Sequence, residues 1–247
     1  MTLPRAIAIV GCLLAGHAIS GALFWALVNV PESNVVMLAL SAAIVVALAF
    51  ALSWTETTAV LAWNPDVTLG RAARRGLMSI VPFVASALVF WIFWWLTSRA
   101  DAWHTAHSGE IDAWWMTQTG SAQTGWIHAA AAILLWLLRY LVGVSLAVGA
   151  LSAGAVHGVR ALASLTWVRR GLSARQIGPM GLAIVALIAL PLRLVYWRPE
   201  SIPPTALEVA FVTAKLSALA LVVTIGWALV LRAGARAISA PSSPSPS

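Results

Sequence analysis

The chain has 247 residues, of which 61% are hydrophobic and only 9% are charged, and its mean hydropathy is +0.89. Soluble domains carry about 25% charged residues, so the composition excludes that class and predicts an integral membrane protein. We expect the net charge of +7 to face membrane lipids, including anionic lipid of the inner leaflet, and we expect no nucleic-acid partner.

Six apolar runs are long enough to cross a bilayer, since a spanning helix needs roughly 20 apolar residues. They cover residues 6–30, 34–54, 77–97, 126–153, 177–197 and 204–231. The sequence therefore predicts an all-α integral membrane protein, with a six-helix transmembrane domain over residues 1–238. The polar, proline-broken residues 239–247 predict a disordered cytoplasmic tail.

The first run contains Arg5, the single cysteine Cys12, and His17. Arg5, a short apolar stretch and Cys12 follow one another as in a lipoprotein signal. Only five apolar positions, 7–11, separate them, which is fewer than the 7 to 15 that a signal needs. We therefore predict a spanning helix with Cys12 as a small buried side chain. We expect His17 to be a hydrogen-bonded interior residue, because no second histidine lies at its depth to form a haem site.

Basic residues gather in alternate connections between the runs, and membrane insertion keeps such residues in the cytoplasm. We therefore predict that both termini are cytoplasmic, and we place the protein in a bacterial inner membrane. The residues on that side are Arg5, Arg71, Arg74, Arg75, Arg160, Arg169, Arg170, Arg175, Arg232 and Arg236. The inner connection 156–172 mixes apolar and basic residues, which predicts a short interfacial helix. Its interface residues would be Arg160, Trp167, Arg169 and Arg170.

The outer connection 98–125 contains the sequence DAWHTAHSGEIDAWW at residues 101–115. His104 and His107 lie three residues apart and would share a helix face with Asp101. Imidazole and carboxylate groups are ligands for zinc or copper, so these three residues are a candidate metal site.

A short interfacial helix is the alternative interpretation of the same connection. Ser108 could cap this helix, with Glu110 and Asp112 in the first turn. Trp114 and Trp115 would then lie at the membrane surface, in an aromatic belt that accounts for most of the fourteen tryptophans.

Four charged residues fall inside the predicted spanning segments, where a charge is costly and often functional. They are Arg139, Arg193, Glu208 and Lys215, and Glu208 is the only acid that we place in such a segment. Arg193 and Glu208 should lie at similar depth and form an ion pair. Arg139 and Lys215 should lie deeper. Arg139 would bond carbonyls in a polar crevice and Lys215 would reach toward the surface, or both would meet another subunit or an anionic ligand.

No nucleotide-binding, hydrolase or metalloprotease motif occurs in the sequence, and no motif requires a cofactor. Our first hypothesis is therefore a noncatalytic accessory or assembly subunit that binds other membrane subunits. The alternative is a transport permease component, or a lipid- or anion-binding protein, that uses Arg139 and Lys215. A metal-dependent enzyme at the outer histidines is the third possibility, so the sequence favours a protein that is not an enzyme.

Overall fold

The computed structural model describes residues 2–31, 33–197 and 205–239. All regular structure in these ranges is helical. The elements are α1 (Leu3–Asn29), α2 (Val35–Ala62), α3 (Leu69–Gly76), α4 (Ile80–Ala106), α5 (Ser108–Thr119), α6 (Gly125–Trp136), η1 (Leu137–Val142), α7 (Gly143–His157), α8 (Arg160–Ala163), α9 (Thr166–Gly171), α10 (Ala174–Tyr196) and α11 (Thr205–Ser239).

Six helical segments are long and apolar enough to cross a membrane, which confirms the predicted class. They are Leu3–Asn29, Val35–Ala62, Ile80–Ala106, Gly125–His157, Gln176–Tyr196 and Leu207–Arg236. The second segment runs to Ala62, well beyond the predicted end at residue 54. The predicted tail begins inside α11, which reaches Ser239, and its remaining residues 240–247 lie outside the described part of the chain.

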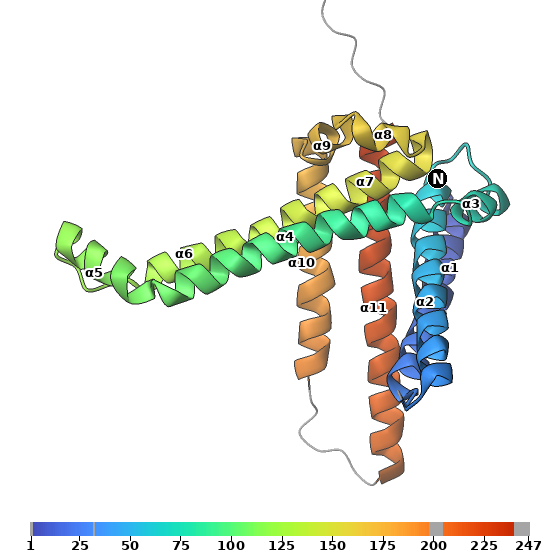
Figure 1. Cartoon of the computed structure of the whole chain (residues 1–247), viewed down its shortest axis with the longest axis horizontal. Coiled ribbons are helices and arrows are strands. Elements are labelled where there is room, and N and C mark those ends of the chain that lie inside the picture. The colour runs from blue at the N-terminus through green and yellow to red at the C-terminus, as the bar shows by residue number, and fades with distance from the viewer. Residues whose placement is uncertain (1, 32, 198–204, 240–247) are drawn as a thin grey trace, which may run out of the picture.

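The long helices point in two directions (Figure 1). Helices α1, α2, α10 and α11 run alongside one another, with the neighbouring pairs α1–α2 and α10–α11 in extensive contact. Helix α4 pairs with α6, η1 and α7 in a hairpin that crosses these four helices steeply and extends beyond them. We call residues 98–136, which form the far end of this hairpin, the arm.

The core lies where α7 passes α1, α2 and α11, and small residues let these helices approach closely. A Cβ on Gly154 would lie 2.7 Å from the Pro82 Cβ of α4, and a Cβ on Gly234 would overlap Val148. Ile9 and Leu13 of α1 are completely covered in the same core. Cys12 lies beside them in the sequence but is exposed on the helix surface, so the prediction of a buried Cys12 was wrong.

One end of the molecule gathers the start of α1, the short helices α3, α8 and α9, and the last turns of α11 (Figure 1). Arg5 of α1 connects several parts of this end. Its guanidinium donates hydrogen bonds to the carbonyl oxygens of Ala62, Asn64, Pro65 and Val67, and the Val67 bond is the shortest of these. These carbonyls close α2 and the turn after it. The arginines that we predicted to share one side of the membrane therefore gather at this end, which we call the basic end.

Short helices form in both connections where they were predicted. The inner one contains α8 and α9, and Trp167 of α9 is buried against α7, with its Nε1 donating to the Leu162 carbonyl at 3.0 Å. The outer one contains α5, but Ser108 does not cap it. Ser108 is instead the first residue of α5 and follows its N-cap residue His107, and the Ser108 hydroxyl donates to the Thr105 carbonyl of α4 at 3.0 Å.

Candidate functional site

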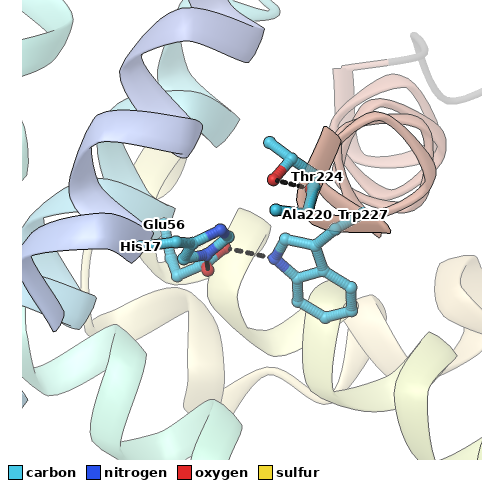
Figure 2. A network of polar contacts seen from close by, with 5 residues as sticks. All are labelled: His17, Glu56, Ala220, Thr224 and Trp227. Atoms are coloured by element: carbon cyan, nitrogen blue, oxygen red, sulfur yellow. Dashed lines mark hydrogen bonds and ion pairs between the residues drawn. The ribbon is translucent and has the colours of Figure 1, made fainter. Parts of the chain in front are cut away.

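A buried carboxylate joins three of the long helices (Figure 2). Glu56 of α2 lies against His17 of α1, with the Glu56 Oε1 atom 2.9 Å from the His17 Nε2 atom. Trp227 of α11 donates its indole N–H to Glu56 Oε2 at 2.7 Å. Each carboxylate oxygen therefore has one partner, and the three side chains hold α1, α2 and α11 together.

Local packing brings these side chains into reach. Gly16 precedes His17, and a Cβ at that position would overlap Thr55, so the absence of a side chain lets α1 lie directly against α2. Glu56 is 6% exposed and lies six residues before the end of α2, which is about 9 Å along the helix axis. The carboxylate is therefore buried by protein within Val35–Ala62, a helix that is long and apolar enough to cross a membrane.

The His17–Glu56 pair brings two ionisable side chains into direct contact, with the imidazole against the carboxylate. An imidazole and a carboxylate in direct contact share one proton or two, and the number changes the local charge. The His17 side chain is 30% exposed and that of Glu56 only 9%, so His17 is the more accessible of the two groups. His17 therefore forms the exposed side of the pair.

Other buried polar atoms surround this part of the protein. The hydroxyls of Thr57 and Thr58, which follow Glu56 on α2, have no hydrogen-bond partner among the described residues. The same is true of the Ser20 hydroxyl on α1. Buried polar atoms are usually satisfied, so these three hydroxyls are exceptions within the part of the chain that the structure describes.

The sequence analysis missed Glu56 because it ended the second run at residue 54. The statement that Glu208 is the only acid in a spanning segment was therefore wrong. The signal was present in the sequence, since the polar residues SWTETT at 53–58 are followed by the apolar residues AVLAW at 59–63. The expectation that His17 is hydrogen-bonded inside the protein is confirmed by its contact with Glu56.

Arg139 has partners within the chain. Its Nε donates to the Thr97 hydroxyl at 2.9 Å and its terminal nitrogen donates to the Ser98 hydroxyl at 3.3 Å. The guanidinium lies over the Trp94 ring, 4.6 Å from the ring centroid. Arg139 lies in the π-helical turn η1, and its polar crevice is made by hydroxyls of α4 instead of the predicted carbonyls.

Lys215 reaches from α11 to the end of α10. Its Nζ donates to the carbonyl oxygens of Val195 and Trp197 at 2.7 and 2.9 Å. These oxygens belong to the last turn of α10 and the residue after it, where no further helical N–H is available. A cation at this end of a helix also favours the helix dipole, so Lys215 caps α10.

Arg193 and Glu208 do not form the expected ion pair in the described part of the chain, and both are exposed. Lys215 occupies the end of α10 that we had expected Arg193 and Glu208 to join. The prediction of a charged pair fixing the α10–α11 hairpin was therefore wrong.

The outer histidines are divided between two sets of contacts. His104 Nε2 lies 3.3 Å from His128 Nδ1, and His128 Nε2 contacts Asp112 Oδ1 at 2.8 Å. His107 instead bonds the Trp103 carbonyl through Nδ1 at 2.8 Å and stacks on the Trp103 ring. This polar cluster of His104, His128 and Asp112 joins α4, α5 and α6 near the tip of the arm.

The His128 hydrogen bond, followed by that of Thr124, holds the pKa of Asp112 below its ordinary value. Among the residues that the structure describes, no three His, Cys, Asp or Glu side chains form a group that could hold a metal ion. Asp101 and His107 are thus not joined to His104 in such a group, and a metal site at Asp101, His104 and His107 stays a prediction.

The predicted interface residues occupy different surroundings. Trp114, Arg160 and Arg169 are exposed, whereas Trp115 is partly covered by Trp126, at a ring-centroid distance of 5.1 Å. Arg170 is half-buried and has an interaction within the protein. Trp114, Arg160 and Arg169 are therefore the residues of this set that lie openly on the protein surface.

Comparison with protein-family models, curated proteins and solved structures finds no match for this chain. Its class follows from composition and fold, which define a polytopic, all-helical membrane protein.

Proposed function

We propose that the protein is a transport permease component that takes up and releases a proton at Glu56. The observation that carries this proposal is the buried Glu56 carboxylate, held between three helices by His17 and Trp227. An ionisable group inside a spanning segment is costly, and in membrane proteins such groups commonly mark ion or proton pathways.

Protonation of Glu56 would change how the three helices are held. A carboxylate accepts hydrogen bonds at both oxygens, whereas a neutral carboxyl keeps one weaker acceptor and gains an O–H donor. The bonds from His17 and Trp227 would then be rearranged, which shifts the balance between packings of α1, α2 and α11.

Two readouts test this proposal on the purified, reconstituted protein. Infrared difference spectra after a pH change should contain a carboxyl band that is lost in Glu56→Gln and kept in Glu208→Gln, which alters an exposed acid of α11. Under an imposed membrane potential, the interior of vesicles that contain the wild type or the Glu208→Gln variant should then acidify. The interior of vesicles that contain Glu56→Gln should not. A carboxyl band that is unchanged in Glu56→Gln would contradict the assignment of the proton site to Glu56. A carboxyl band from Glu56 without acidification of the vesicles would contradict proton transport.

An accessory or assembly subunit is the second candidate, and the arm is the observation that favours it. No residue of α5 or α6, both fully described, is buried. The arm exposes Trp103, Trp114 and Trp126 and stands away from the other helices (Figure 1). This hypothesis no longer draws support from Arg139 and Lys215, because both have partners within the chain.

A photo-crosslinking residue at position 114 tests the second candidate in native membranes. It should capture a distinct membrane protein, whereas the same residue at Val36 of α2, which is more exposed than Trp114, should not. Crosslinking to lipid alone at position 114, together with a monomeric purified protein, contradicts an accessory role. The metal-dependent enzyme gains no support from the contacts of His107.

A further inference from the structure

A hollow of about 630 Å³ lies at the basic end, between α3, the start of α4 and the end of α7. Three arginines of α3 line one wall, namely Arg71, Arg74 and Arg75. The remaining wall is formed by Met78, Ser79, Pro82, Gly154, Ala155, Val156, Gly158 and Val159. The hollow therefore combines a strongly basic side with a largely apolar one.

The arginines are presented by a firmly held helix. Ala72 and Gly76, four residues apart, are buried on the inner face of α3, and the Trp54 indole donates to the Ala73 carbonyl at 2.9 Å. The Thr68 hydroxyl accepts a hydrogen bond from the Arg71 N–H and caps the helix start. The backbone that carries the three charges is thus fixed before any ligand binds.

No acid among the described residues is paired with these three arginines. All three guanidinium-bearing side chains are exposed, and none forms an ion pair with a carboxylate in the described part of the chain. Three cations on one eight-residue helix repel one another, and a bound anion would relieve this repulsion. Arginine suits phosphate in particular, because its planar donors match two phosphate oxygens at once.

The apolar wall indicates where the phosphate comes from. Met78 is 89% exposed and Val159 is 51% exposed, and both line the hollow beside the arginines. Gly158 carries no side chain, and a Cβ at this position would have no atom within 4 Å, so the space beside it is open. Large apolar side chains next to unpaired cations, at the end of apolar spanning helices, match a molecule with a charged head and a hydrocarbon chain.

We propose that this hollow binds the phosphate headgroup of an anionic phospholipid, with Arg71, Arg74 and Arg75 on the phosphate and Met78 and Val159 against the start of the acyl chain. The site lies at the basic end, apart from Glu56, and does not depend on the proton-transport proposal. It assigns the lipid contact to three specific arginines instead of the basic surface as a whole.

A charge-matched comparison tests the site. The purified protein is placed in phosphatidylcholine nanodiscs that contain fluorescent phosphatidylglycerol, and lipid binding is measured for the wild type and two triple variants. Arg71→Gln/Arg74→Gln/Arg75→Gln should weaken binding by about fivefold per arginine, on the order of a hundredfold in total. The control Arg160→Gln/Arg169→Gln/Arg236→Gln removes the same charge from exposed arginines outside the hollow and should change binding by less than about fivefold. Equal losses in both variants would overturn the site.

A shape variant and a competitor complete the test. Val159→Trp fills the hollow without changing charge and should also weaken phosphatidylglycerol binding, while the thermal unfolding midpoint confirms that each variant is folded. Inorganic phosphate should compete only weakly, because it lacks the acyl chain. Displacement of the lipid by inorganic phosphate at equal concentration, or unaltered lipid binding in Val159→Trp, would overturn the lipid assignment.

Discussion

Truncation of Glu56 gives the sharpest test of how α1, α2 and α11 are held together. Glu56→Ala removes the acceptor of the Trp227 indole and the partner of His17. A buried donor left without an acceptor costs about 1–3 kcal/mol, but hydrogen bonds inside membrane proteins average about 0.6 kcal/mol. His17 is partly exposed and can find another partner, so we expect a total loss of about 1–3 kcal/mol in the free energy of unfolding.

A double-mutant cycle separates the hydrogen bond from the lost packing. The free energy of unfolding is measured in bicelles for the wild type, Glu56→Ala, Trp227→Phe and the double variant. The Glu56–Trp227 coupling should be about 0.5–1.5 kcal/mol, whereas Glu208→Ala combined with Trp227→Phe should be additive. A coupling within the ~0.3–0.5 kcal/mol scatter of independent sites would refute the view that the 2.7 Å contact holds α2 to α11.

Three further predictions concern helix packing, helix capping and pH. Gly16→Ala should destabilise the protein by about 1–3 kcal/mol, because the new Cβ overlaps the facing helix α2. Gly11→Ala has open space around it and should leave the melting temperature unchanged. Equal effects of the two substitutions would contradict the close approach of α1 to α2. Lys215→Met should speed amide hydrogen exchange in the last turn of α10, with partial rescue by Lys215→Arg, and unchanged exchange would rule out the cap. The His128 hydrogen bond lowers the pKa of Asp112 from 3.8, so this bond should stabilise the fold fully above pH 3.8 and progressively less as the pH falls through the lowered pKa. The melting temperature of Asp112→Asn should therefore fall less on acidification than that of the wild type. Identical acid profiles of the two proteins would count against this linkage.

The six spanning helices could be predicted because hydropathy alone determines which segments are long and apolar enough. Their directions could not. The angle of the α4–α7 hairpin depends on packing such as that of Gly154 against Pro82, and hydropathy contains no information on tilt. The sequence therefore predicted the helices but not that two of them cross the other four.

For the charged residues, too, the sequence predicted some features and not others. The sequence identified Arg139 and Lys215 as costly to bury, but their partners are hydroxyls and carbonyls of other helices, which no charge count would identify. Glu56 was missed for a different reason, since polar residues near a helix end resemble the start of a loop. Only the burial of five of the six residues 53–58 by neighbouring helices shows that the spanning helix continues past them.

The Arg5 contacts can form only after a certain length of chain has been synthesised. The side chain that holds the start of α1 obtains its carbonyl acceptors only after residue 67 has been synthesised, so these contacts can form only when both α1 and α2 have been made. Closure of the α1–α2 hairpin is then a single event that joins the first residues of the chain to the turn after α2. Extensions fused ahead of Arg5 would have to leave this turn accessible while it forms, which makes the opposite terminus the better position for a tag.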